Sequence, residues 1–299
     1  MASKICVITL SRDNPIELAR TLASVLLQTE RPTQHLVIDG SSPETAPSMR
    51  RLAERAGADY HWLKPAGIYS AMRNSVSLAE PDTYAWWLNS SDRMATPSSL
   101  SAAAAAIRQS TKFGMGHWVI GQLIRERGER HGMHPIGADG RDFVMRFQRG
   151  LVGFPHPSTL FQVSSLSSLD AYSGPLRIAE DYRLGLAFLQ KYGPPAITRH
   201  PLAIHTADGF SYKRPIRHSV EKLRARFELL PDWSLAKEAE LLVRNGPKTV
   251  AARITARMGP PLEVLQLTEP NPSLHFCNER ANGDWPRCCE AKLASYASI

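Results

Sequence analysis

"YAWWLNSSDRM", Tyr84 to Met94, changes abruptly from an apolar run to a polar one. The aromatic and aliphatic residues stop at Asn89, and one carboxylate, Asp92, follows two serines. A short apolar run bounded by polar residues is typical of a strand that is covered on both faces of a parallel sheet. Open α/β sheets bind their ligands at the carboxyl ends of such strands. The stretch therefore predicts a buried strand that carries Asn89 and Asp92 to a binding site.

Strand and helix patterns alternate in strict order around this stretch. Apolar runs rich in β-branched and aromatic residues predict strands in "ICVITL", "HLVIDG", "DYHWLK" and "TYAWWL". Between and after them, amphipathic segments predict helices from Pro15 onward and in "SMRRLAERAG", "YSAMRNSVSLAE" and "TPSSLSAAAAAIRQS". This order predicts an α/β fold in which helices cover both faces of a mostly parallel, Rossmann-like sheet. Asp39, like Asp92, then falls at the end of a strand.

The remainder of the chain is less regular. Strands are predicted in "WVIGQLIRERG" and "GFPHPSTLFQV", and "IAEDYRLGLAFLQKYG" is an amphipathic helix closed by glycine. Basic amphipathic helices follow, and the periodic pattern then ends in sequence rich in proline and asparagine. We therefore expect one α/β domain over residues 1–215, a basic helical extension over 216–260 and a poorly ordered tail over 261–299.

Composition limits the classes of partner. The 299 residues are 43% hydrophobic and 21% charged, with a net charge of +8 and a pI near 9.5. This balance favours acidic partners such as nucleotide phosphates or anionic lipid headgroups, or else a solvated basic surface. The basic residues are dispersed and form no recognisable nucleic-acid module, so no nucleic-acid partner is expected. With no membrane-spanning run and no signal-peptide pattern, we expect a cytoplasmic protein.

Three of the four cysteines lie near the carboxyl terminus. Cys277, Cys288 and Cys289 follow His275, which makes a zinc site conceivable. Adjacent cysteines lack the usual two-residue spacing of zinc ligands, however, so the composition favours a loosely ordered tail. Cys6 lies in the first apolar strand and is expected in the core.

Two segments could bind a phosphorylated ligand. Asp39 follows "LVI" at a strand end, where it can accept hydrogen bonds from a base or a sugar, or cap the turn that follows. In "KPAGIYSAMRNSV" a loop leads into a helix near Tyr69, and a helix start suits phosphate. Lys64 and Arg73 add positive charge on either side. The alternative for this loop is an ordinary solvated surface.

An acidic pair opens the later helix "EDYRLGLAF". Glu180 and Asp181 are adjacent, so they point to different sides of the helix. One can face a site while the other caps the helix or pairs with Arg177 or Arg183. A carboxylate is a competent general base for a hydroxyl that loses its proton, whereas the pair alone also suits the helix dipole.

Taken in order, these segments resemble the inverting family-2 glycosyltransferases of the GT-A fold, in particular a bacterial surface-polysaccharide subgroup. The resemblance covers about residues 5–211. It rests on "ICVITLSRDNPIELARTLASVLLQT", "LVIDGSSPET", "KPAGIYSAMRNSV", "WWLNSSD", "FPHPSTLF", "IAEDYRLGLAF" and "ADGFS". It implies transfer of a sugar, with inversion, from a nucleoside-diphosphate sugar, with a UDP-sugar first among the donors.

The resemblance also implies roles for single residues. Asp181 would be the general base, and His156 and Glu180 would lie on the acceptor side. The remaining residues would bind the nucleotide sugar: Asp39, Lys64, Arg73, Asn89 and Asp92. A Mg2+ or Mn2+ ion would neutralise the departing diphosphate. The acceptor would be a glycan or a lipid-linked sugar in exopolysaccharide, capsule or lipopolysaccharide synthesis. The basic helices would either pack against the catalytic domain or be in peripheral contact with the inner membrane.

The sequence departs from the subgroup where its metal site is expected. Ser91 stands where the first of two aspartates is usual, Ser70 replaces an aspartate, and Leu10 replaces a proline. Three alternatives follow: Asp92 takes over the metal with His205 or water, Lys64 and Arg73 carry the leaving-group charge without metal, or catalysis has been lost. In the last case the protein would be an inactive GT-A-like binder of nucleotide sugar or glycan.

Overall fold

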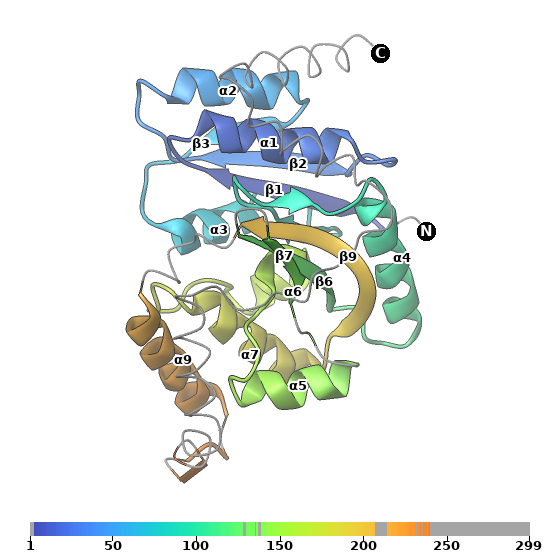
Figure 1. Ribbon diagram of the computed structural model, residues 1–299, viewed down its shortest axis with the longest axis vertical. Coiled ribbons are helices and arrows are strands. Elements are labelled where there is room, and N and C mark those ends of the chain that lie inside the picture. The colour runs from blue at the N-terminus through green and yellow to red at the C-terminus, as the bar shows by residue number, and fades with distance from the viewer. Residues whose placement is uncertain are drawn as a thin grey trace.

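One twisted mixed sheet runs through the centre of the protein (Figure 1). The computed structural model describes residues 3–127, 130–134, 136, 139–206 and 214–230, with 232–234, 236, 237 and 239. Within these residues the strand order is β3-β2-β1-β4-β8-β6-β9-β5, and β7 pairs with β6. The strands are β1 (Ile5–Ser11), β2 (Gln34–Asp39), β3 (Asp59–Trp62), β4 (Tyr84–Trp87), β5 (Arg93–Met94), β6 (Trp118–Arg127), β7 (Arg130–Met133), β8 (Thr159–Gln162) and β9 (Ala196–Thr206).

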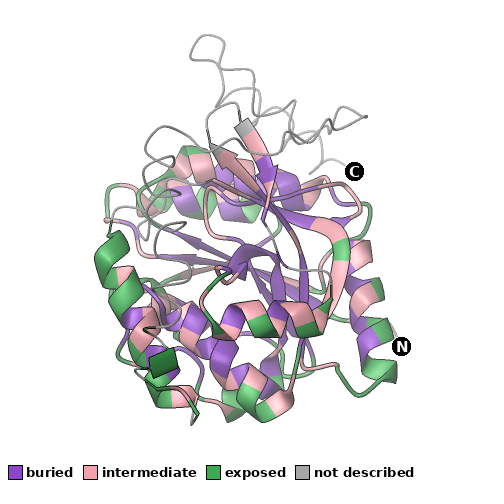
Figure 2. Cartoon of the chain, turned by 60° about the horizontal axis from the view of Figure 1, so that its bottom comes forward, coloured by how far each residue is buried: buried purple, intermediate pink, exposed green. Residues whose placement is uncertain are grey.

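Helices cover both faces of this sheet, as the sequence predicted (Figures 1 and 2). They are α1 (Pro15–Leu26), α2 (Ala46–Arg55), α3 (Ile68–Val76), α4 (Ser99–Lys112), α5 (Gly140–Gln148), α6 (Val163–Ser168), α7 (Glu180–Tyr192) and α9 (Pro215–Leu229), with the 3-10 turn η1 (His156–Ser158). Alternate residues of β1 enter different clusters: Ile8 packs with α3 and α7, and Val7 packs with α4. The strand is buried on both faces because successive side chains point to opposite sides.

The sheet is parallel where the sequence is regular and mixed where it is not. β1, β2, β3 and β4 are mutually parallel, so their carboxyl ends meet at one edge. β8 runs antiparallel between β4 and β6, and β9 returns parallel to β6. Of the expected strands, "GFPHPSTLFQV" is therefore the one that breaks the parallel order.

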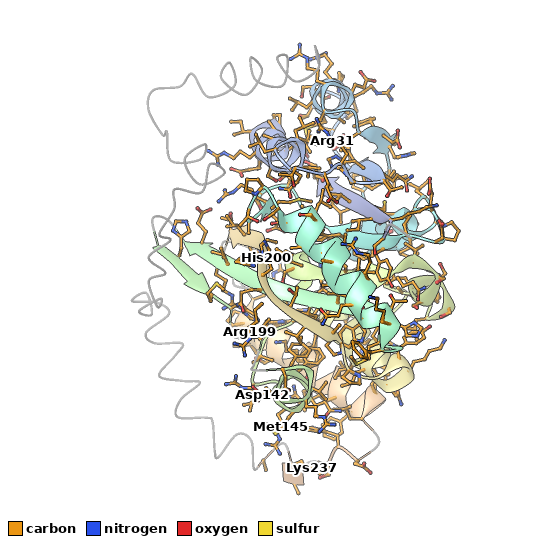
Figure 3. All side chains as sticks on the ribbon, turned by 90° about the vertical axis from the view of Figure 1, so that its right-hand side faces the viewer. Arg31, Asp142, Met145, Arg199, His200 and Lys237 are labelled. Atoms are coloured by element: carbon orange, nitrogen blue, oxygen red, sulfur yellow. The ribbon has the colours of Figure 1, made fainter. Side chains whose placement is uncertain are left out.

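Strand β9 crosses the molecule and was not predicted from the sequence. Pro201 interrupts its apolar run, and proline in a strand argues against a central position. The structure accommodates it at irregular pairing with β6 near Gly121, whose missing side chain leaves room for Leu202. Figure 3 shows His200 of β9 beside α4, and its ring lies 3.2 Å from the Thr96 hydroxyl.

Several expectations lie outside the described residues. They are the loop at 207–211, most of the extension beyond residue 230 and the whole of the tail over 261–299, with its cysteines. In the part of the chain that is described, no helix is both long enough and apolar enough to cross a membrane.

Helix α9, the described part of the basic extension, lies alongside α7 (Figure 1) and is tied to the segment before it. Glu221 is only 7% exposed, and its Oε2 accepts from the backbone N–H groups of residues 177, 178 and 179, at 3.0, 2.7 and 3.1 Å. Arg217 donates to the other oxygen at 2.9 Å. One carboxylate of α9 thus holds the turn that leads into Glu180 and Asp181.

We expect Glu221→Ala to lower the free energy of unfolding at pH 7 by about 3 kcal/mol, because it strands buried N–H groups. Glu221→Gln keeps an acceptor oxygen and should lose about 1 kcal/mol. Glu228→Ala is the matched control on α9. It removes a more exposed ion pair to Arg183 and should cost under about 1 kcal/mol. Urea unfolding monitored by circular dichroism measures all three.

The penalty of Glu221→Ala should also depend on pH. Burial alone would raise the pKa of Glu221, but Arg217 and the backbone N–H groups outweigh it and lower that pKa. A carboxyl whose pKa is lowered on folding stabilises the protein above its unfolded pKa, near 4.3, and loses this effect as pH falls further. A penalty that stayed constant from pH 7 to pH 3 would contradict the assigned role.

Candidate functional site

A pocket of about 310 Å³ opens at the carboxyl ends of β1, β2 and β4. Its floor comes from these strand ends, and its wall is the segment 63–71 with the first turn of α3. Gly67 precedes that helix with φ 100°, a backbone conformation that side chains other than glycine rarely adopt. The pocket therefore places a helix start, with its unpaired N–H groups, opposite the strand ends.

Asp39 lines this pocket but is itself fully buried. Its Oδ1 accepts from the Ser41 backbone N–H at 3.0 Å and from the Ser41 hydroxyl, and its Oδ2 accepts from Tyr60 at 2.6 Å. Asp39 thus caps the turn after β2, which is one of the two roles that the sequence left open. A ligand can therefore hydrogen-bond to the Asp39 carboxylate only if Tyr60 or Ser41 shares that carboxylate with it.

Positive charge reaches the pocket from two sides. Lys64, which was expected from the sequence, is exposed and lines the pocket. Arg12, which was not expected from the sequence, is also exposed and also lines the pocket. Arg12 directly follows β1, so the strand-end argument that selected Asp39 could have found it. Arg73 does not line this pocket: it lies further along α3, where its guanidinium donates to Asp170 at 3.0 and 3.2 Å.

Two buried oxygens at the pocket have no hydrogen-bond partner in the structure. They are Asn89 Oδ1 and Ser11 Oγ, and both residues line the pocket. An unsatisfied buried polar group costs roughly 1–3 kcal/mol. A polar ligand in the pocket would remove that cost, so these atoms mark the end of β4 and the end of β1 as binding positions.

The turn after Asn89 directs Asp92 toward the end of β9. Ser91 has φ 101°, and its backbone is held by Thr21 and Thr206. Asp92 is 1% exposed, and its Oδ1 lies 2.7 Å from His205 Nδ1. Burial lowers the pKa of His205, but the attraction and hydrogen bond of Asp92 outweigh it, so the net shift is upward.

The donors near Asp92 resemble part of a cation site. The carboxylate of Asp92 contacts the imidazole of His205, which lies near the end of β9, and the turn that carries Asp92 begins at Asn89, whose side-chain oxygen has no partner. Among the described residues, no three His, Cys, Asp or Glu side chains converge as a set of metal ligands. The protein therefore offers two strong donors here, Asp92 and His205, and any cation would need further ligands from a bound anion.

Asp181 lies at the start of α7 and is joined to the pocket wall through α3. The Tyr69 hydroxyl contacts Asp181 Oδ1 at 3.2 Å and donates to the Ile178 carbonyl at 2.7 Å. Burial raises the pKa of Asp181, and the Tyr182 N–H and Lys222 oppose the rise without cancelling it. A carboxylate with a raised pKa is a better proton acceptor. The charge of Asp181 also raises the pKa of His205, the histidine that contacts Asp92.

The two residues expected on the acceptor side, His156 and Glu180, both have partners within the protein. Glu180 is fully buried and accepts from the Gly174 N–H at 3.1 Å and from Arg183 at 3.2 Å. The acidic pair thus divides its roles, with Glu180 stabilising the preceding loop. His156 is 5% exposed, and its Nε2 lies 2.7 Å from the Tyr172 hydroxyl. Neither side chain is presented on an open surface.

No family model and no curated protein sequence matches the chain. Solved structures do match its fold. Staphylococcus aureus TarS 1–349 in complex with UDP-GlcNAc aligns with TM-score 0.62 and 15% identity, over 81% of this chain and 72% of that one. The mannosyltransferase PcManGT from Pyrobaculum calidifontis, with GDP-Man and Mn2+, aligns with TM-score 0.55 and 16% identity, over 100% and 87%.

A third structure is more distant. Glucosyl-3-phosphoglycerate synthase from Mycobacterium tuberculosis, with Mn2+, UDP and glucosyl-3-phosphoglycerate, aligns with TM-score 0.50 and 13% identity, over 76% of this chain and 81% of that one. All three are named as glycosyltransferases or solved with a nucleotide or nucleotide sugar. The chain therefore has the GT-A glycosyltransferase fold, as the resemblance of its motifs implied.

Proposed function

We propose that this protein is an inverting glycosyltransferase that moves a sugar from a nucleoside-diphosphate sugar to a glycan or lipid-linked acceptor. The observation that carries the proposal is the pocket at the strand ends, with two unsatisfied oxygens, together with the carboxylate of Asp181, which Tyr69 joins to the helix that forms the pocket wall. The fold adds support, because its structural neighbours were solved with UDP-GlcNAc, UDP or GDP-Man.

The donor enters the strand-end pocket in this proposal. Asp39 contacts the nucleotide base, and Asn89 contacts the sugar nucleotide with its unpartnered oxygen. Lys64 and Arg12 attract the diphosphate, which also suits the helix start at Gly67. A UDP-sugar is the first donor to test.

A divalent cation fits this site only together with the nucleotide. Asp92 and His205 would hold Mg2+ or Mn2+, the oxygen of Asn89 lies in the same turn, and diphosphate oxygens would complete the shell. Mn2+ is expected to be the better ion, because imidazole nitrogen is a softer ligand than carboxylate or water. When bound, the ion neutralises negative charge on the leaving nucleoside diphosphate.

Asp181 acts as the general base. It accepts the proton of the acceptor hydroxyl while that oxygen bonds to the anomeric carbon, and the bond from this carbon to the diphosphate oxygen breaks. Attack on the face opposite the leaving group inverts the configuration. Tyr69 holds one oxygen of Asp181 at 3.2 Å, and Glu221 of α9 fixes the turn before it.

The second candidate is a catalytically inactive protein that binds a nucleotide sugar or a glycan. Ser91 favours it, because a carboxylate expected for the metal is missing at that position. This protein would share the donor pocket with an active enzyme but would not depend on Asp181 for any turnover.

The acceptor and pathway extend the same proposal. A lipid-linked acceptor for exopolysaccharide, capsule or lipopolysaccharide would place the enzyme at the inner face of the membrane. Helix α9 supports peripheral contact, because Ile216 and Val220 are 76% and 58% exposed beside basic side chains.

A melting experiment tests the donor site. At a hundredfold excess over its dissociation constant, a nucleotide should add about 2.7 kcal/mol and raise Tm by several degrees. We expect UDP to do so, with a further rise on adding Mn2+. Asp92→Ala should keep the UDP rise and lose the Mn2+ increment. Asp82→Ala, an exposed aspartate paired with Lys4, is the control and should behave as wild type. If neither UDP nor GDP shifted Tm, a donor site here would be excluded.

Turnover separates the two candidates. Asp181→Asn keeps a side-chain oxygen for the Tyr182 N–H but accepts no proton, so donor cleavage should fall by about 10²–10⁴-fold. Its Tm rise with UDP should equal that of wild type. Release of UDP from a UDP-sugar, with water or added acceptor, gives the rate. Equal rates in both proteins would remove Asp181 as the base, and the absence of any turnover beside normal UDP binding would favour the inactive protein.

A further inference from the structure

Two half-buried cations, one on β6 and one on α9, lie outside any salt bridge in the described part of the chain, although the charge of Asp181 acts on the second. Arg125 of β6 and Lys222 of α9 form no salt bridge, and Arg125 Nε is buried without a hydrogen-bond acceptor. By contrast, Arg93, which is also buried, pairs with Glu126 at 2.7 Å. A cation withdrawn from water without a counter-charge is costly, so its retention calls for a compensating anion.

The fold brings these cations to the same region. Arg125 lies opposite His205 in the pairing of β6 with β9. Its guanidinium reaches Gly153, where a Cβ would lie 3.7 Å from Arg125 and 3.4 Å from the ring of His134. His134 is 2% exposed, its Nε2 lies 3.0 Å from the Gly153 carbonyl, and its Nδ1 has no partner. Arg125 and His134 therefore flank the same glycine, and Arg125 Nε is buried there without an acceptor.

Lys222 approaches the same region from α9. Its ammonium lies 5.1 Å from the centre of the Tyr182 ring, and Tyr182 follows Asp181 directly. The pKa of Lys222 is lowered to about 8, chiefly by burial and in smaller part by Arg226 and Arg125, while the charge of Asp181 opposes the decrease. Lys222 therefore lies close enough to both Asp181 and Arg125 for their charges to act on it.

We propose that Arg125 and Lys222 form an anion-binding subsite that holds a phosphate or carboxylate group of the acceptor, next to the hydroxyl that Asp181 deprotonates. The inference rests on the proposed function, since Asp181 defines the acceptor side. Arginine suits this role because its planar fork binds such groups through two hydrogen bonds. The substrate class is therefore an anionic acceptor, such as a sugar or polyol phosphate, rather than a neutral glycan.

The donor diphosphate is the other anion that could reach Arg125, because His205 lies beside it. The experiment therefore fills the donor site first. The full-length protein is saturated with UDP and Mn2+ and titrated calorimetrically with glycerol 3-phosphate, with inorganic phosphate and with glycerol, all at constant ionic strength. Affinity for UDP is measured in parallel for every variant.

We expect wild type to bind the two phosphate compounds and not glycerol. Lys222→Gln and Arg125→Gln should each weaken that binding at least tenfold, while Lys222→Arg, which keeps the charge, should restore most of it. Lys191→Gln is the matched control: Lys191 also lies over a tyrosine ring, 5.4 Å from the centre of Tyr192, but near the other end of α7. It should bind phosphate as wild type does.

Two results would overturn the proposal. Unchanged phosphate affinity in both glutamine variants would show that these cations bind no anion. A loss of UDP affinity in both, equal to the loss of phosphate affinity, would assign them to the donor diphosphate. If wild type bound no nucleotide at all, the proposed function would fail separately, and titration of the nucleotide-free protein with phosphate would still decide whether the subsite exists.

Discussion

The hydrogen bond between Asp92 and His205 joins the turn after β4 to the end of β9, close to the place where a ligand is expected. Its partners are 113 residues apart, one after β4 and one near the end of β9, and their atoms lie 2.7 Å apart. Asp92 raises the pKa of His205 against the effect of burial, so the pair resembles a preformed ion pair. A metal on one nitrogen of His205 excludes the second ring proton of an imidazolium, because a ligating histidine must be neutral, but the N–H that Asp92 accepts can remain. Nucleotide-dependent metal binding and protonation of His205 are therefore alternatives for one position.

A second connection makes the later helices part of the site. Tyr69 of α3 contacts Asp181, and α3 begins at the wall of the strand-end pocket. Glu221 of α9 in turn holds the turn before α7 through three backbone N–H groups. Asp181 is thus held in position by α3, which forms part of the pocket wall, and by α9, which follows it in the chain. A boundary at residue 215 separates segments of different composition, but it does not separate the supports of this carboxylate.

The first 112 residues could be predicted well because their signals are local. Each strand is a short apolar run and each helix is amphipathic, so β1 to β4 and α1 to α4 follow from the pattern, apart from the two-residue strand β5. The rule that parallel strands share one ligand-binding edge then located Asp39 and Asn89 at the pocket. The rule could not tell that Asp39 would be engaged by Tyr60, since that depends on how β3 packs against β2.

Prediction weakened where a residue's role depends on distant contacts. Arg73 and Lys64 look equivalent in sequence, yet one pairs with Asp170 and the other lines the pocket. Glu180 and Asp181 are neighbours, and only the contacts with Gly174 and Tyr69 distinguish them. Strand β9 was missed because Pro201 breaks its pattern, although it supplies His205. For Arg73 and Asp181 the deciding contact lies about 100 residues away, where no local pattern in the sequence reveals it.

The missing aspartate at Ser91 is best understood through charge balance across the whole site. A diphosphate in the strand-end pocket would meet Arg12 and Lys64, which line it, whereas the Asp92–His205 pair lies outside the pocket lining, after the turn that begins at Asn89. His205 can either carry a second ring proton or bind a metal ion. In both cases one carboxylate, that of Asp92, balances the positive charge, whereas a second carboxylate would add a negative charge that must itself be neutralised. Lys222, on which the charge of Asp181 acts, and Arg125 add further positive charge. Under the proposed function, both substrates would then be anions, and the net charge of +8 would reflect what the site binds as well as what keeps the surface solvated.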